Sequence, residues 1–96
     1  RRVLFRSVVT YSGSHLYYKF IPSETATYNF KSTGGSSLDP YITLYDENES
    51  EIGDDDDMDD GDYNFSLSRQ LTQGKTYYID TYARNNGSYH MVITKN

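Results

Sequence analysis

The chain has no cysteine and no tryptophan, and only two prolines among its 96 residues. Without cysteine no disulfide can stabilise it, so a domain of this size depends on its hydrophobic core or on a bound metal. No apolar run approaches the length that a membrane-spanning helix needs, and we therefore expect no membrane insertion. The length suits one domain with a single modest core.

Positive charge is also scarce. Nine lysines and arginines stand against 14 aspartates and glutamates, which gives a net charge of −5 at pH 7. Three of these bases are Arg1, Arg2 and Arg6, and the others are scattered along the chain. Because the sequence has no basic stripe that could replace the counterions of a phosphate backbone, we expect no nucleic-acid partner.

The motifs of catalysis are missing as well. The two histidines, His15 and His90, have no nucleophile at a motif spacing, and the sequence contains no Gly-x-Ser-x-Gly motif, glycine-rich phosphate loop or zinc pattern. A glycosidase needs two carboxylates in different environments, whereas most of the acids here share one segment. We therefore expect a protein that is not an enzyme.

The first seven residues, 1–7 (RRVLFRS), match nothing in the pattern of the rest. A common sequencing adapter read in one frame can encode them. We hypothesise that they are a non-native leader, either a sequencing artefact or an engineered end, and leave them out of the fold prediction. The alternative is an ordinary basic leader. Residues 8–96 are then expected to form a single domain, and any export signal would lie upstream of the residues given.

Aromatic residues are abundant, with 11 tyrosines and 4 phenylalanines. Apolar residues alternate with polar ones in short segments separated by turn residues, and no segment has a helical period. The expected strands cover residues 7–11, 15–21, 26–32, 41–45, 51–52, 63–69, 76–83 and 88–94. Seven to eight short strands of this kind predict an all-β antiparallel sandwich of jelly-roll or Greek-key type.

The alternation also predicts which side chains face the core. These are Tyr18, Phe20, Tyr28, Phe30, Ile42, Leu44, Phe65, Leu67, Tyr77, Ile79, Thr81, Tyr89, Met91 and Ile93. Most of them are aromatic or β-branched, so we expect a core built largely of rings with tyrosine hydroxyls at its edge.

Acidic residues are concentrated in residues 46–62, which hold 11 of the 14 acids and no base. Six of the seven residues 54–60 are aspartates. Such crowding is unfavourable unless the charges are solvated or a cation neutralises them. Calcium takes six to eight oxygen ligands, which a flexible aspartate loop can supply. The spacing is not that of an EF-hand, because Met58 would occupy a ligand position if Asp56 opened the loop.

The ordered segments YYKF, ATYNF, LDPYITLYD, NFSLS, QGKTYYI and GSYHMVI resemble the bacterial pre-peptidase C-terminal (PPC) domain over about residues 15–95. The resemblance implies a small calcium-binding jelly roll without catalytic activity, appended to secreted proteases and collagenases or repeated in surface proteins. It matches Asp39 to the acid that opens the LD-x-Y strand. It matches Asp56 and Asp57 to paired aspartates after the returning strand. The further aspartates of residues 54–60 depart from the family pattern and leave the ligand set open.

We therefore expect Ca²⁺ to bind between Asp39, just before the expected strand 41–45, and residues 54–62, which we call the aspartate-rich segment. The candidate ligands are Asp39, Asp54, Asp55, Asp56, Asp57, Asp59, Asp60 and Asp62. The alternative is an acidic loop that is solvated and holds no metal.

A second candidate surface consists of tyrosines that the alternation directs outward. Tyr17, Tyr78 and Tyr82 can stack on sugar rings or pack against a neighbouring protein. The alternative is ordinary cross-strand pairing of aromatic rings.

Together these patterns predict a bacterial extracellular or cell-surface module that is non-enzymatic, binds calcium and acts as a structural or adhesive unit. The expected partners are neighbouring copies or domains of the same protein, with possible assembly into a fibre by strand addition at a free edge, or an extracellular polymer. The alternative function is that of an accessory domain of a secreted hydrolase, which would bind a polysaccharide or collagen-like substrate.

Overall fold

A computed structural model describes residues 2–11, 15–33, 39–55, 64–83, 85 and 87–95, with only the backbone described for residues 2–11, 87 and 88. These ranges contain eight β-strands. The strands are β1 (Arg2–Tyr11), β2 (Leu16–Phe20), β3 (Ala26–Thr33), β4 (Pro40–Tyr45), β5 (Glu51–Asp55), β6 (Ser66–Leu71), β7 (Tyr77–Ala83) and β8 (Gly87–Lys95). Across the described ranges, no helix is long and apolar enough to cross a membrane.

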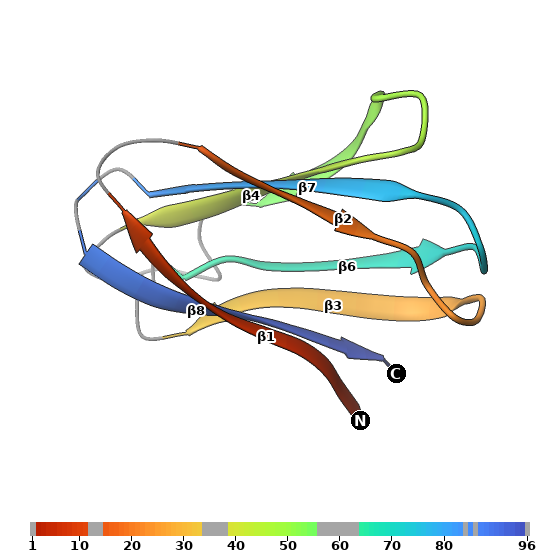
Figure 1. Ribbon diagram of the computed structural model, residues 1–96, viewed down its shortest axis with the longest axis horizontal. Coiled ribbons are helices and arrows are strands. Elements are labelled where there is room, and N and C mark those ends of the chain that lie inside the picture. Colours follow the sequence, from red (N-terminus) through yellow and green to blue (C-terminus); the bar gives the residue numbers. More distant parts are fainter. Residues whose placement is uncertain are drawn as a thin grey trace.

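The strands form two four-stranded antiparallel sheets that lie face to face, as the two ribbon layers of Figure 1 show. One sheet has the order β1-β8-β3-β6, and the other has the order β2-β7-β4-β5. The chain therefore crosses from one sheet to the other after every strand except β4, which is followed by its neighbour β5 in the same sheet. This exchange between sheets is the topology of an eight-stranded jelly roll, so the predicted fold class is confirmed.

The core lies between the sheets and contains the residues that the period-two alternation assigned to it, together with Leu71 and Ala83, which the prediction missed. Tyr28, Phe30, Ile42 and Leu44 are fully buried, and Tyr18 and Phe20 pack partly buried against the same cluster. The other predicted members are also buried: Phe65, Leu67, Tyr77, Ile79, Thr81, Tyr89, Met91 and Ile93. Burying one such apolar side chain stabilises the fold by about 1.5–3 kcal/mol. The tyrosine hydroxyls reach the edge as expected, since Tyr28 Oη donates to the carbonyl oxygen of Glu24 at 2.6 Å.

The antiparallel order determines which connections lie at the same end of the sandwich. The last residues of β1, β3, β5 and β7 and the first residues of β2, β4, β6 and β8 lie at one end, which we call the Asp39 end. The connections between β2 and β3, β4 and β5, and β6 and β7 lie at the opposite end. At that opposite end Asp46 forms a side-chain turn, because its Oδ1 accepts hydrogen bonds from the amides of Asn48 (2.8 Å) and Ser50 (3.0 Å).

The prediction for strand β5 was too short. The expected strand ended at residue 52, but β5 continues to Asp55, with Asp54 opposite Thr43 and Asp55 opposite Ile42. Aspartate has low strand propensity, yet here the ladder with β4 outweighs it. Because β5 is an edge strand, the exposed Asp54 carboxylate remains in water.

Two other strands differ from the expected ones by two residues or more at an end, and the remaining strands differ by at most one residue at each end. Strand β1 begins at Arg2, so the backbone of most of the hypothesised leader pairs with β8 as an edge strand. This pairing leaves open whether residues 1–7 are native, and their non-native origin stays a hypothesis. Strand β6 begins at Ser66 and ends at Leu71, where the pattern placed the strand at residues 63–69.

Candidate functional site

The start of β4 carries the first candidate metal ligand, Asp39. This residue is half-buried, its Oδ1 atom is buried, and its backbone has a positive φ of 54°. A left-handed conformation is uncommon outside glycine, although aspartate tolerates it better than most residues. The surrounding structure must offset its cost, and such positions cluster where a ligand or a switch is held.

The end of β5 carries two further candidates with different surroundings. Asp54 is exposed, whereas Asp55 is half-buried and its Oδ2 accepts a hydrogen bond of 2.7 Å from the backbone amide of Ser66. This bond joins the last residue of β5 to the first residue of β6. Asp55 therefore holds the end of β5, in one sheet, against the start of β6, in the other. The aspartate-rich segment connects these two strands.

A buried serine fixes the residues that precede β6. Ser32 Oγ accepts a hydrogen bond from the amide of Phe65 at 2.9 Å and donates one to Asn64 Oδ1 at 3.0 Å. The Ser32 amide also donates to the carbonyl oxygen of Phe65 at 3.1 Å. These bonds hold the chain before β6 against the end of β3, so both ends of the aspartate-rich segment are anchored at the Asp39 end.

The remaining candidate ligands, Asp56, Asp57, Asp59, Asp60 and Asp62, lie outside the described residues. Among the residues that are described, no three acidic, histidine or cysteine side chains come together as a metal-binding group. The three candidates within the described ranges are Asp39, at the start of β4, and Asp54 and Asp55, at the end of β5. Calcium binding stays a prediction.

The outer surface of the sheet β2-β7-β4-β5 carries a group of tyrosines, which we call the tyrosine face. Its members are Tyr17 on β2, Tyr41 and Tyr45 on β4, and Tyr78 and Tyr82 on β7. The predicted Tyr17 is 71% exposed, while Tyr78 and Tyr82 are half-buried. Tyr41 and Tyr45 were missed, although the inward positions of Ile42 and Leu44 imply that their neighbours face outward.

A nearly buried carboxylate lies in the middle of the tyrosine face. Asp80 is 7% exposed and stands between Tyr17 and Thr43 in the cross-strand register. Its Oδ1 and Oδ2 atoms lie 2.8 Å and 3.0 Å from Nδ1 of His15. No sequence pattern connects His15 with Asp80, because the two residues are far apart in the chain and meet only through the register of β2 with β7.

The His15 ring contacts three tyrosines. It stacks on Tyr82 with a centroid distance of 4.6 Å and an interplanar angle of 27°, and it lies nearly parallel to Tyr17 at 6.1 Å. Tyr41 meets the same ring edge-on at 6.5 Å and also packs against Tyr82 at 5.1 Å. Together the rings and Asp80 form a polar aromatic surface that is fixed by packing.

The electrostatics of the tyrosine face are negative around Tyr45. Burial raises the pKa of the Tyr45 hydroxyl above its usual value of 10.0, and the charges of Asp80 and Glu51 raise it further. A surface of this kind disfavours additional negative charge, so it suits a neutral or cationic ligand better than an anionic one.

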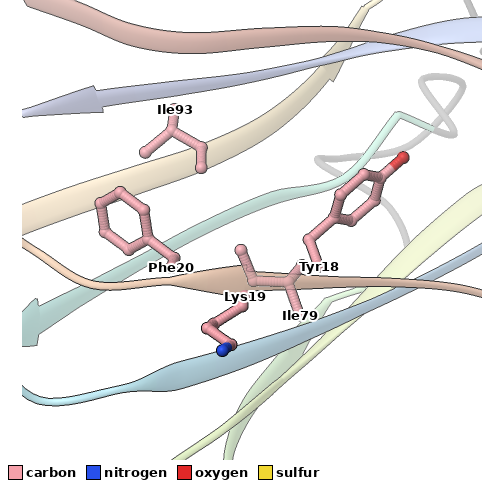
Figure 2. Close-up of a pocket in the computed structure, with 5 residues that line it drawn as sticks. All are labelled: Tyr18, Lys19, Phe20, Ile79 and Ile93. Atoms are coloured by element: carbon pink, nitrogen blue, oxygen red, sulfur yellow. The ribbon is translucent and has the colours of Figure 1, made fainter.

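One small cavity lies beside β2, on the inner side of the same sheet. Its volume is about 80 Å³, and its lining consists of Tyr18, Lys19, Phe20, Ile79 and Ile93. Figure 2 shows Phe20 and Ile93 on the same side of β2, while the ammonium group of Lys19 points to the other side. Ligand pockets usually measure about 300–1,000 Å³, so this cavity is too small for a substrate.

A scan of the chain against models of known protein families finds no match, and a search of curated proteins finds no relative.

Proposed function

We propose that this chain is a non-enzymatic extracellular module that binds calcium and serves as a structural or adhesive unit of a bacterial cell-surface or matrix protein. The observation that supports it best is the convergence of candidate ligands at one end of the sandwich. The left-handed Asp39 comes directly before strand β4, at the end of the sandwich where β5 carries Asp54 and Asp55. The aspartate-rich segment begins at the same end.

The physical case for calcium rests on charge. Aspartates crowded between two anchored strands repel one another, and water screens them only in part. A divalent cation with six to eight oxygen ligands would offset that repulsion. The chain has no disulfide to stabilise the fold instead. The resemblance of its ordered segments to the PPC family also favours calcium over other hard cations.

Calcium would then make the stability of the folded module depend on whether it is inside or outside the cell. A ligand that binds only the folded state stabilises it in proportion to the logarithm of its concentration above Kd. Extracellular modules bind calcium with a Kd of about 10⁻⁴–10⁻³ M. Such a site is filled outside the cell and empty in the cytosol. The module would reach its full stability only after export, where it would contact neighbouring copies or domains and could extend into a fibre.

The tyrosine face supports a second candidate function, the accessory domain of a secreted hydrolase. Five outward tyrosines on three neighbouring strands form an aromatic surface, and Tyr17 is largely open to solvent. Aromatic surfaces of this kind bind polymers with alternating apolar and polar groups. A polysaccharide or a collagen-like chain would be the substrate that such a domain holds for its enzyme.

Thermal unfolding of the full chain tests the calcium proposal. Melts are recorded with millimolar calcium, with millimolar magnesium and with chelator. Calcium should raise Tm by several degrees, because ΔΔG of 1 kcal/mol shifts Tm by about 4–8 °C in a domain of this size. Magnesium should raise it far less, since it demands rigid octahedral coordination. Three identical melts would refute calcium binding and leave the tyrosine face as the better candidate.

A further inference from the structure

The tyrosine face has a feature that neither calcium binding nor ring stacking explains, the nearly buried Asp80 at its centre. A carboxylate removed from water is costly unless hydrogen bonds and an opposite charge compensate it. The partner of Asp80 is His15, whose side chain is 40% exposed. Within the described ranges, no lysine or arginine forms an ion pair with Asp80.

The compensation by His15 comes from a single nitrogen. Both carboxylate oxygens of Asp80 lie near Nδ1 alone, so the imidazole offers them one N–H donor. A permanent cation would serve Asp80 better. The surrounding charges also favour a cationic ligand. Glu51 and Asp54 on β5 are exposed acids, whereas Lys19 is the one lysine or arginine among the described residues of this face.

The geometry of Asp80 selects among cations. Both carboxylate oxygens lie within 3.0 Å of the same nitrogen, so both point toward the position of the imidazole. A guanidinium group presents two parallel N–H donors that fit a carboxylate in this orientation, whereas an ammonium group acts as a point charge. The His15 position therefore suits an arginine side chain.

The rings around this position also suit a guanidinium group. The imidazole that occupies it lies flat against Tyr82 and nearly parallel to Tyr17, with the edge of Tyr41 beside it. A planar cation in the same place would stack on tyrosine faces while it pairs with Asp80. Such cation–π contacts add to an ion pair, and arginine makes them more often than lysine.

We infer that the tyrosine face is a docking site for an arginine side chain of a partner protein, which takes the place of His15 on Asp80. His15 lies just before β2 and is half exposed, so it can turn into solvent without disturbing the sheet. The chain has a net charge of −5, which complements a basic segment on the partner. This inference does not depend on calcium.

Titration of the ¹⁵N-labelled full chain by NMR tests the inference. The probe is a blocked pentapeptide with arginine between glycines, and the controls are the same peptide with citrulline, the neutral isostere of arginine, and with lysine. The arginine peptide should produce saturable shifts at residues of β2, β4 and β7. The citrulline peptide should bind at least about tenfold more weakly, because charge-assisted hydrogen bonds are lost.

Four variants locate the site. Asp80→Asn should weaken the arginine peptide about tenfold or more, and Tyr17→Ala about two- to fivefold. His15→Ala should strengthen binding, because the competing imidazole is gone. Glu49→Gln is the matched control, since it removes one negative charge at an exposed position in the turn between β4 and β5 and should change affinity less than about twofold. Tyr17 is exposed, so its variant reports on binding even where Asp80→Asn disturbs folding.

Three results would overturn the inference. Equal binding of the arginine and citrulline peptides would show that charge does not matter. An unchanged affinity in both Asp80→Asn and Tyr17→Ala would place the arginine elsewhere. A neutral oligosaccharide that shifts the same residues while the arginine peptide shifts none would identify the tyrosine face as a sugar-binding surface. Titrations in saturating calcium and in chelator keep these outcomes separate from the calcium proposal.

Discussion

The guanidinium group of Arg69 lies directly over the backbone of Gly53, so that a Cβ atom at position 53 would stand 2.8 Å from both Nε and Nη2. Arg69 belongs to β6 at the edge of one sheet, and Gly53 to β5 at the edge of the other. Arg69 Nε donates a hydrogen bond of 2.9 Å to the carbonyl oxygen of Ile52. The arginine thereby joins the two edge strands that the aspartate-rich segment connects, and only glycine leaves room for it.

This relationship predicts a change of sign in the effect of Gly53→Ala. In the native chain the new methyl group displaces the guanidinium and breaks its bond to Ile52, which should cost about 0.5–1.5 kcal/mol in the free energy of unfolding. In an Arg69→Ala background the same substitution should stabilise by about 0.4–1 kcal/mol, because alanine restricts the unfolded chain more than glycine. Urea unfolding of the four proteins of this cycle measures both values. Equal effects in the two backgrounds would contradict the contact.

The neighbouring pair Asp54 and Asp55 offers a matched comparison. Asp55→Ala removes the acceptor of the Ser66 amide and should lower the free energy of unfolding by about 1–3 kcal/mol. Asp54→Ala removes the same charge one residue earlier, where the side chain is exposed, and should stay within about 0.5 kcal/mol of the native value. Urea unfolding in chelator keeps any bound metal out of the comparison. Similar losses in both variants would mean that the hydrogen bond does not anchor the segment.

The calcium response provides a third prediction, which depends on Asp39. Asp39→Asn keeps the size of the side chain and tolerates the left-handed backbone, yet it loses the negative charge that calcium prefers. It should therefore lose most of the rise in Tm that calcium causes in the native chain. Glu49→Gln is the control, because Glu49 is also left-handed (φ 63°) but lies at the opposite end of the sandwich. Its calcium response should be unchanged, and a parallel loss in both variants would refute a site at the Asp39 end.

The core was predictable from the sequence because strand alternation is a local signal. Each of Tyr28, Phe30 and Ile42 has polar or outward-facing neighbours, and the period of two alone assigns it to the inside. The order of the strands is not local. Nothing in the sequence indicates that β8 lies between β1 and β3, since such pairings depend on which surfaces fit once all strands exist.

The candidate sites were predictable only where a single segment carried the signal. The number of aspartates was enough to predict a candidate site in this segment. That Asp54 and Asp55 belong to a strand was not predictable, because it depends on the pairing of β5 with β4. The pairing of His15 with Asp80 needs the register of two strands, and the contact of Arg69 with Gly53 needs two edges from different sheets. Arg69 is solvent-exposed, as an arginine on an edge strand usually is, so the sequence does not indicate that its side chain contacts the other sheet.

The raised pKa of Tyr45 predicts a loss of stability at alkaline pH. Burial is the main cause, and the charges of Asp80 and Glu51 add to it. The unfolded chain ionises this hydroxyl near pH 10, below the folded protein, so the stability it contributes is complete below pH 10 and falls as the pH rises toward the folded pKa. Tyr45→Phe removes this fall, and its urea midpoint should therefore decline less than the native one between pH 9 and pH 11. The difference should shrink in a Glu51→Gln background but persist, because burial remains. Parallel declines in the native chain and Tyr45→Phe would mean that the environment of Tyr45 does not oppose its ionisation.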